Sequence, residues 1–506
     1  MEIKVFAGDA SSVSGPMLVV FAVDAAEGKG AEASPALLSS ADAVRSASGV
    51  LAAGEFKASL GEIALIRRPS GLATERLMLV GLGKQKELTA DKFRKGAGTA
   101  VRAAKQRALR ELTIAAPESA AAPGTPEVDA KLAARAIVEG AEFGAVDYDT
   151  YRSDRKVTEI DSLTLLSPAP NAEISSGVEE GRVVAAAQKL TRSLVNEPGN
   201  VLTPTELGRR AKAMCDEAGL KCEVYSSEKI QALKMEAFWA VAKGSAQPPA
   251  LIVMTYEPAD PAKDSPVLGL VGKGITFDTG GISIKPADGM EKMKYDMAGA
   301  AAMIGAMQAI SKLKPKVKVI GVVCSAENMP DGKAFKPGDV VTAMSGKTIE
   351  IVNTDAEGRL VLSDGLHYAK TLGCTHLINA ATLTGACMIA LGLVNFGIFS
   401  NDDATCERFM EGLKVSGEKG WRLPCTDDYR DLIKSEIADI RNTGVNRYGG
   451  ATTAAMFLKE FAGDTPWVHL DIAGCAWNDD KKPWHAYGPS GVAVRSIIEW
   501  VRSYSA

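Results

Sequence analysis

Two stretches of the chain carry acidic side chains where a predicted strand gives way to a predicted helix. The first contains GKGITFDTGGISIKP (residues 272–286) and then MKYDMAGAAA (residues 293–302), and the second is NTDAEGRL (residues 353–360). Loops that leave parallel strands at their carboxyl ends meet at one edge of a sheet. We therefore expect one cleft to contain four carboxylates, those of Asp278, Asp296, Asp355 and Glu357.

Four carboxylates in one cleft repel each other, and burial would force some of them to bind protons unless cations compensate their charge. Carboxylate oxygens suit hard or borderline divalent cations, and a bridging carboxylate lets two ions lie about 3.5–4 Å apart. Asp355 and Glu357 are two residues apart on an extended segment, so their side chains can point the same way. The pattern indicates a two-metal site, with an ordinary acidic surface turn beside a glycine as the alternative.

Two lysines accompany the carboxylates. Gly272 and Gly274 flank Lys273, a pattern that permits close backbone approach at a strand end. A lysine in such a loop is commonly a solvated charge, but beside two cations its pKa can fall far below about 10.4, and the neutral amine can then bind metal. Lys285 has the same two interpretations, with stabilisation of negative charge on a carbonyl oxygen as its functional role.

These segments together resemble the signature sequences of the leucyl aminopeptidase family of metallopeptidases. NTDAEGRL carries the resemblance, and NEPGN (residues 196–200) and ATLTGA (residues 381–386) extend it. The matching strings follow the family's order and spacing, cover the second predicted domain well and hardly extend into the first.

The resemblance implies a metal centre with two sites that take Zn²⁺ or Mn²⁺. The tighter site corresponds to Lys273, Asp278, Asp296 and Glu357, and the more exchangeable site to Asp278, Asp355 and Glu357. It further implies that the protein hydrolyses the N-terminal peptide bond of peptides with a water activated by the two ions, and that two-domain subunits form a homohexamer.

Catalytic and substrate-binding roles also follow from the resemblance. Lys285 corresponds to the electrophile, and Arg359 to the residue that holds a bicarbonate ion as general base. Four positions match residues that border the pocket for the first side chain or offer backbone acceptors to the amine, namely Met293, Thr382, Leu383 and Gly385. An apolar lining favours Leu- or Met-like first residues, although one methylene discriminates by only ~1–3 kcal/mol. Met293 and Leu383 have ordinary core packing as their alternative.

The elements that must position these residues form two domains. We expect an N-terminal α/β domain at residues 1–165, with an oligomerisation or accessory role, and a larger catalytic α/β domain at residues 166–506. In the second domain, helical stretches at 298–313 and 359–372 alternate with apolar runs, which indicates βαβ units and a mostly parallel central sheet flanked by helices. The apolar runs are Ala250–Tyr256, Val267–Val271, Val317–Cys324, His376–Ala380 and Val468–Ile472.

Composition narrows the functional classes. The 506 residues contain 58 Lys plus Arg and 62 Asp plus Glu, a net charge of −4, so there is no global positive field to bind nucleic acid or an anionic membrane. Eight cysteines without a CxxC pair are typical of a reducing compartment, and the start of the sequence does not resemble a secretory signal. These features predict a cytoplasmic protein.

Alternative functions have weaker support. The charge-free stretch Leu377–Ser400 is long enough to span a bilayer, but polar and glycine residues interrupt it, so we expect no membrane span. Between Lys84 and Arg110 lie nine Lys or Arg and two acidic residues, which leaves DNA binding open as an additional but not favoured role. The Gly81-Leu82-Gly83 segment lacks the third glycine of a dinucleotide-binding loop, and the chain contains no GxSxG or HExxH motif.

Overall fold

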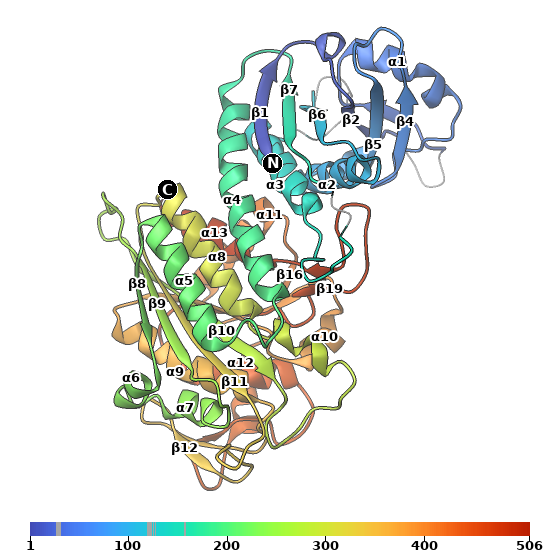
Figure 1. Ribbon diagram of the computed structural model, residues 1–506. Coiled ribbons are helices and arrows are strands. Elements are labelled where there is room, and N and C mark those ends of the chain that lie inside the picture. The colour runs from blue at the N-terminus through green and yellow to red at the C-terminus, as the bar shows by residue number, and fades with distance from the viewer. Residues whose placement is uncertain (27–31, 119–123, 125, 127, 156–157, 506) are drawn as a thin grey trace. The chain divides into compact units, whose positions relative to one another are not determined.

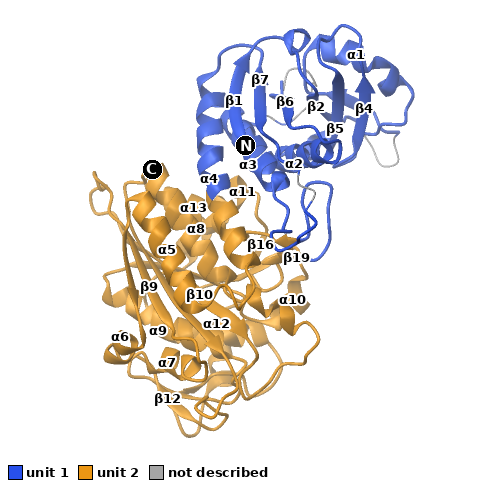
Figure 2. Ribbon diagram, in the orientation of Figure 1, with its two compact units in different colours: residues 1–186, 479–487 blue, residues 187–478, 488–506 orange. Residues whose placement is uncertain are grey.

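The computed structural model describes residues 1–26, 32–118, 124, 126, 128–155 and 158–505, which form two compact units (Figures 1 and 2). Unit 1 contains Met1–Ala186 and Asp479–Tyr487, and unit 2 contains Ala187–Asn478 and Gly488–Ala506. The division at residue 186 lies beyond the expected boundary at residue 165. Strand β7 (Ser162–Ser167) and the first part of helix α4 (Ala172–Asn196) belong to unit 1, because β7 lies inside the sheet of that unit.

Unit 1 is built on a seven-stranded sheet in the order β1-β7-β6-β2-β5-β4, with β3 paired to β2. The first five strands of this order are parallel, whereas β4 and β3 are antiparallel to their neighbours. The strands are β1 (Glu2–Ala7), β2 (Leu18–Asp24), β3 (Pro35–Leu37), β4 (Ile63–Arg67), β5 (Arg76–Lys84), β6 (Glu111–Ala115) and β7 (Ser162–Ser167).

Helices cover both faces of this sheet because successive residues of a buried strand point to opposite sides. Val19 and Phe21 of β2 pack with helices α2 (Ala90–Gln106) and α3 (Ala130–Ala145). The alternate residues of β2, such as Val20, pack on the other face with α1 (Ala41–Ala52). Helix α4 (Ala172–Asn196) follows β7. The expected N-terminal α/β fold is confirmed.

Unit 2 contains an eight-stranded sheet in the order β16-β15-β18-β14-β10-β11-β9-β8. The four central strands, from β18 to β11, are parallel. On one side β15 is antiparallel to β18 and parallel to β16, and on the other β9 is antiparallel to both β11 and β8. The strands are β8 (Lys221–Tyr225), β9 (Ala250–Tyr256), β10 (Val267–Asp278), β11 (Lys318–Asn328), β14 (His376–Ala381), β15 (Phe396–Ser400), β16 (Gly420–Arg422) and β18 (Trp467–Asp471).

The helices of unit 2 also cover both faces of their sheet (Figure 1). Val271 and Ile275 of β10 join a large core with residues of α7, α9 and α12. On the other face, Gly272 of β10 lies against the backbone of α8, at a distance that leaves no room for a side chain. The helices are α5 (Pro204–Ala218), α6 (Ser227–Ala232), α7 (Glu236–Ala242), α8 (Ala298–Leu313), α9 (Glu357–Thr371), α10 (Gly385–Leu391), α11 (Asp403–Ser416), α12 (Gly450–Ala462) and α13 (Val494–Arg502).

Two small sheets complete unit 2. One joins β12 (Val340–Thr342), β13 (Thr348–Glu350) and β17 (Ile440–Arg441), and the other pairs β19 (Trp477–Asn478) with β20 (Gly488–Pro489). The NTDAEGRL segment therefore leaves a strand of the small sheet, and not a strand of the central sheet as its sequence suggested. It reaches the same place because α9, which begins at Glu357, packs against β10.

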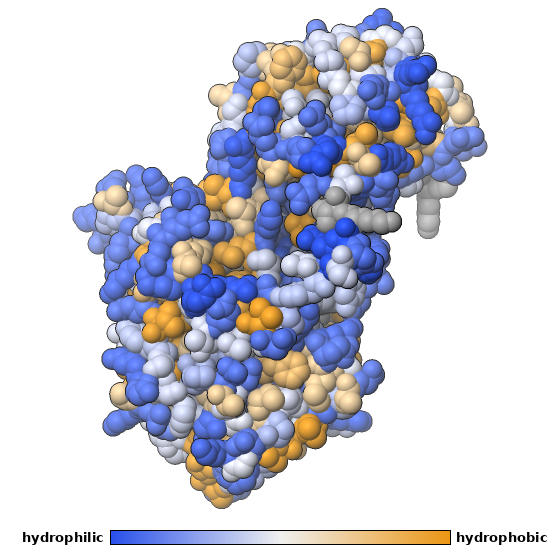
Figure 3. All heavy atoms as spheres, viewed as in Figure 1, coloured by the Kyte–Doolittle hydropathy of each residue, from blue (hydrophilic) through white to orange (hydrophobic). Residues whose placement is uncertain are grey.

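The charge-free stretch Leu377–Ser400 divides into strand β14, the seven-residue helix α10 and strand β15. Among the residues that the structure describes, no helix is long and apolar enough to cross a membrane. On the face drawn in Figure 3, hydrophilic side chains predominate and hydrophobic ones are scattered among them.

Candidate metal centre and active site

The carboxyl edge of the central sheet in unit 2 gathers the polar groups that the sequence singled out. Lys273 and Asp278 belong to β10 itself, because this strand extends to residue 278 and not only to residue 271 as predicted. Thr382 directly follows the neighbouring strand β14, and Asp296 follows the 3₁₀ helix η4 (Met290–Tyr295). Ligands bind at this edge in open α/β sheets.

Lys273 connects three parts of the chain. Its ammonium lies 2.8 Å from Asp296 Oδ2 and 2.8 Å from Glu357 Oε1, and it donates a hydrogen bond of 3.0 Å to the carbonyl of Thr382. The Thr382 hydroxyl in turn donates to Asp296 Oδ1 at 2.7 Å. The side chain of Lys273 is buried, so these bonds are shielded from water. Gly358 packs directly against it, and a Cβ atom there would lie 2.6 Å from Lys273 Cε.

Lys285 connects the remaining carboxylates. Its ammonium lies 2.7 Å from Asp278 Oδ2 and also pairs with Asp355 Oδ1. The other oxygen of Asp278 accepts hydrogen bonds from the Gly280 N–H (2.9 Å) and from Asn328 Nδ2 (2.8 Å). Lys285 retains more exposure than Lys273, with 21% of its side chain accessible. It therefore lies at the solvent side of the cluster.

The donor set fits divalent metal ions. Asp278, Asp355 and Glu357 each offer a carboxylate oxygen, and these oxygens all lie within 4.8 Å of one another. Asp296 is joined to this group through Lys273. Within the described part of the chain, Glu357 Oε2 is buried and accepts no hydrogen bond. Because a buried carboxylate oxygen without a partner is costly, this oxygen is suited to a cation.

The electrostatics of the cluster point the same way. Burial raises the pKa of Glu357 and of Asp296, and the nearby Asp278 carboxylate raises both further. Burial alone would lower the pKa of Lys273, but the carboxylates of Asp296 and Glu357 outweigh it and raise that pKa above its usual value. With these protein neighbours alone Lys273 is charged, so it can bind a metal only if arriving divalent cations displace its proton.

Arg359 lies one helical turn into α9 and is buried. Its Nη1 donates to the backbone carbonyl of Asn442 at 2.7 Å, and its Nε, also buried, has no partner among the described residues. Burial lowers the pKa of the guanidinium to about 10. A buried guanidinium with unused donor capacity can accept an anion such as a carboxylate or bicarbonate.

A pocket of about 360 Å³ opens beside the cluster. Its charged lining residues are Lys273, Asp278, Lys285, Asp288, Asp296 and Asp355, whereas Glu357 and Arg359 are not in its lining. The four residues expected to bind substrate, Met293, Thr382, Leu383 and Gly385, all line it. The apolar part of the wall also includes residues that sequence reasoning did not single out, namely Met290, Tyr295, Met388 and Ala473.

Three further polar residues that support the site were also missed. Asn328 donates from Nδ2 to Asp278 and to the carbonyl of Thr354. Asn442 accepts hydrogen bonds from the N–H groups of residues 352 and 353, and it donates from Nδ2 to the carbonyl of residue 353. The buried carboxylate of Asp471 holds the loop after β14. The signal for Asp471 was present, because a carboxylate stands inside the apolar run Val468–Ile472.

Comparisons with known proteins identify the family of the chain. Residues 189–498 match the family model described as the catalytic domain of the cytosol aminopeptidase family, and residues 18–155 match its N-terminal domain. A probable cytosol aminopeptidase of Acidobacterium capsulatum is 59% identical, over 97% of each chain. Another from Koribacter versatilis is 57% identical, over 100% of each chain.

Solved structures give the same result. A tomato leucine aminopeptidase mutant superposes with a TM-score of 0.86 at 33% identity, over 99% of this chain and 96% of that one. The bottromycin maturation enzyme BotP in complex with Mn has a TM-score of 0.83 at 35% identity, over 97% of this chain and 99% of that one. The chain therefore belongs to the cytosol aminopeptidase family of metal-dependent aminopeptidases.

Proposed function

We propose that this aminopeptidase removes Leu- or Met-like N-terminal residues from peptides with two divalent cations held by its carboxylate cluster. One observation carries the proposal: three carboxylate oxygens lie within 4.8 Å of one another, beside a buried and unpartnered oxygen of Glu357. The Mn complex of BotP supports Mn²⁺ as one of the ions, with Zn²⁺ as the other candidate.

The metal ligands divide into two overlapping sets. Lys273, Asp278, Asp296 and Glu357 would form the tighter site, and Asp278, Asp355 and Glu357 the more exchangeable one. The bound cations would polarise the scissile carbonyl and lower the pKa of a water molecule toward neutrality. The side chains hold this geometry through bonds of their own, such as the one from Asn328 Nδ2 to Asp278.

Lys285 would act as the electrophile. Its ammonium is in the pocket lining, and the Asp278 and Asp355 carboxylates keep it protonated by raising its pKa against the effect of burial. A fixed positive charge at this position stabilises the negative charge that develops on the carbonyl oxygen during peptide hydrolysis. Its side chain is 21% accessible, so it is not enclosed as fully as that of Lys273.

Arg359 would hold a bicarbonate ion, whose role is to accept a proton as general base. The buried and unpartnered Nε supports this assignment, because it gives an oxyanion a donor that no described protein group uses. The Asn442 carbonyl fixes the opposite side of the guanidinium.

The apolar wall of the pocket supports the substrate preference. Met290, Met293 and Met388 are flexible thioether side chains, which adapt to first residues of different shape. We therefore propose a broad preference for unbranched or γ-branched apolar residues. Cytoplasmic peptides are the proposed substrates, and the proposed assembly is a homohexamer.

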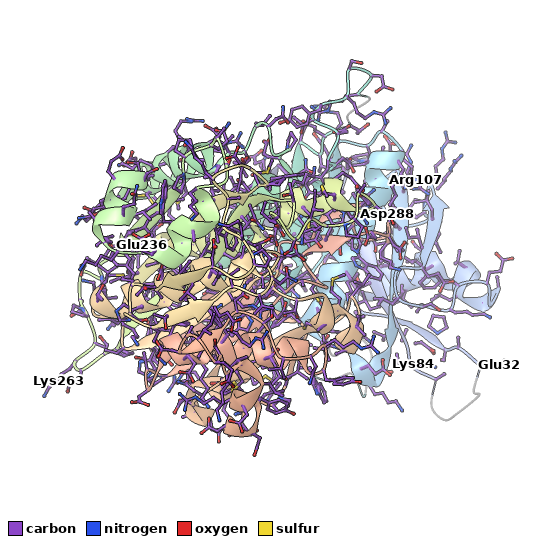
Figure 4. All side chains as sticks on the ribbon, turned by 90° about the horizontal axis from the view of Figure 1, so that it is seen from below. Glu32, Lys84, Arg107, Glu236, Lys263 and Asp288 are labelled. Carbon is purple, nitrogen blue, oxygen red and sulfur yellow. The ribbon has the colours of Figure 1, made fainter. Side chains whose placement is uncertain are left out.

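An additional DNA-binding role finds little support in the basic stretch 84–110. Most of its cations are paired, for example Arg94 with Glu139 (2.7 Å) and Lys105 with Asp147 (2.7 Å). Lys84, at the start of the stretch, pairs with Asp24, and Figure 4 shows it well separated from Arg107. Paired and dispersed cations attract a phosphate backbone weakly.

Metal content and activity test the proposal together. We expect two equivalents of Mn²⁺ or Zn²⁺ per chain and release of leucine from Leu-amide. Exhaustive chelation should abolish the release, and either metal should restore it. Glu357→Gln should lower the metal content, whereas Glu350→Gln, a control outside the cluster, should not. Full activity after complete removal of metal would refute the two-metal proposal.

A further inference from the structure

The loop that follows β14 connects the metal cluster with the substrate pocket. Its residues Thr382 to Gly385 all line the pocket. At one end, the Thr382 carbonyl accepts a hydrogen bond from Lys273, and the Thr382 hydroxyl donates to Asp296. At the other end, Thr384 caps helix α10 by accepting a hydrogen bond from the Cys387 N–H. The conformation of this short loop therefore affects the metal ligands and the pocket wall at once.

Asp471 holds the loop from the neighbouring strand β18 and is not part of the pocket lining. It is the last residue of β18 and pairs in register with Ala381, the last residue of β14. Its Oδ1 accepts hydrogen bonds from the N–H groups of Leu383 (3.2 Å) and Thr384 (3.4 Å), and its Oδ2 accepts the Thr384 hydroxyl at 2.6 Å. Asp471 is fully buried, and its Oδ1 also accepts the N–H of Ala473 at 3.3 Å. Hydrogen bonds from the loop and from Ala473 therefore offset the cost of burying the carboxylate.

The direction of two carbonyl groups follows from these bonds. In a trans peptide unit the N–H and the preceding C=O point in opposite directions. Because the N–H of Leu383 points to Asp471, the Thr382 carbonyl points away from it, and this carbonyl meets Lys273 at 3.0 Å. By the same geometry, the N–H of Thr384 on Asp471 directs the Leu383 carbonyl away from Asp471, and Leu383 lies in the pocket lining.

We propose that Asp471 is a positioning residue of the aminopeptidase: it orients the Leu383 carbonyl to bind an N–H of the substrate and the Thr382 carbonyl to hold Lys273. This inference rests on the proposed peptide substrate, and it assigns Asp471 no contact with the reacting atoms. Asparagine cannot replace the carboxylate without loss. Its amide would donate where Oδ2 now accepts, so the Thr384 hydroxyl proton would lose its acceptor.

Asp364 provides a matched control. It is also a fully buried carboxylate, and it also accepts backbone N–H groups, those of Phe238 (2.9 Å) and Met344 (2.7 Å). It does not line the pocket. Asp364→Asn should therefore reproduce the general cost of neutralising a buried carboxylate without changing how a substrate is bound.

The experiment compares Asp471→Asn and Asp364→Asn in the metal-loaded, full-length protein. For Asp471→Asn we expect a loss of kcat/KM on Leu-amide of about 10- to 100-fold, with two metal ions retained. The ratio of kcat/KM for Leu-amide over Ala-amide should also fall toward unity, because the pocket wall moves. This ratio does not depend on the fraction of folded enzyme, and Asp364→Asn should leave it unchanged.

Two further variants keep the inference testable if Asp471→Asn folds poorly. Thr384→Val removes the hydrogen bond from the hydroxyl to Asp471 and should lower the Leu-to-Ala ratio. Thr384→Ser keeps the hydroxyl and should have the wild-type ratio. A wild-type ratio in both Asp471→Asn and Thr384→Val would overturn the inference. Failure of the wild-type protein to cleave Leu-amide would instead overturn the proposed function.

Discussion

At the scale of single residues, the cluster is a set of like-charged carboxylates whose mutual repulsion is offset by lysines between them. Two lysines lie between four carboxylates, and each lysine contacts a different pair. Lys273 is buried and connects Asp296 with Glu357, whereas Lys285 reaches solvent. The sequence indicated both lysines but could not distinguish their positions, because burial depends on the elements packed over each one.

Lys285→Ala should lower kcat by roughly 10²–10³, the cost of losing one donor to a developing oxyanion. Metal content should stay at two ions per chain, because Lys285 is not one of the proposed ligands. Steady-state kinetics together with metal analysis measure both quantities. Lys336→Ala, which removes an exposed lysine paired with Asp339, is the control and should be silent. Loss of metal from Lys285→Ala would contradict the assigned role.

The metal-free protein should become less stable as pH rises from about 4 to about 8. Burial raises the pKa of Glu357 to about 8 and that of Asp296 to about 6, so the folded state binds more protons than the unfolded state in this window. Stability therefore falls with rising pH. Thermal unfolding of chelated protein at several pH values checks this, and Glu357→Gln should flatten the dependence. Stability that rises with pH in the chelated protein would be inconsistent with this cluster.

At the scale of elements, the site depends on where strands end and where one helix begins. The alternation of apolar runs and helices predicted the parallel centre of the large sheet, and NTDAEGRL marked the start of α9. The contribution of Asn328 could not be predicted. Strand β11 continues past Cys324 to this residue, and the Asn328 side chain donates a hydrogen bond to Asp278, 50 positions away in the sequence. Asn442 binds residue 353 across a larger separation of 89 positions. Such pairings arise only from the packing of elements distant in sequence.

Gly358→Ala should disturb the metal centre although glycine is not a ligand. The added Cβ would lie 2.6 Å from Lys273 Cε and 2.7 Å from its Nζ, so the lysine must move away from Glu357. We expect weaker metal binding, measured by titration of the chelated protein. Gly49→Ala in α1 is the matched control, since a Cβ there meets nothing within 4 Å. It should be neutral or stabilise the protein by about 0.5–1 kcal/mol. Unchanged metal affinity in Gly358→Ala would contradict this packing.

At the scale of the whole molecule, each unit has its own sheet and its own core. The acidic cluster and the pocket lie entirely in unit 2, and the family resemblance of the sequence was carried by the same part of the chain. The basic stretch lies in unit 1, where α2 packs along α3 and its cations face carboxylates. The run of basic residues in the sequence therefore does not predict a positively charged surface, because the fold pairs these cations with carboxylates distant in the sequence.

The protein should not shift a DNA duplex in a gel at physiological salt. Its net charge is −4, and Arg102 and Lys105 share the carboxylate of Asp147, so few cations remain for phosphates. A gel-shift series from low to physiological salt provides the measurement. A complex that persists at physiological salt would restore the DNA-binding alternative.

The return of residues 479–487 to unit 1 limits how this polypeptide can be dissected. Trp484 lies in that returning strip, its carbonyl close to Gly98 of α2 and its ring beneath Lys95. A fragment that ends at residue 186 would lack residues 479–487, so this part of α2 would lose its contacts with Trp484. Neither half can be excised as one continuous piece, so co-expression of complementary fragments is a better route to studying the amino-terminal half than simple deletion.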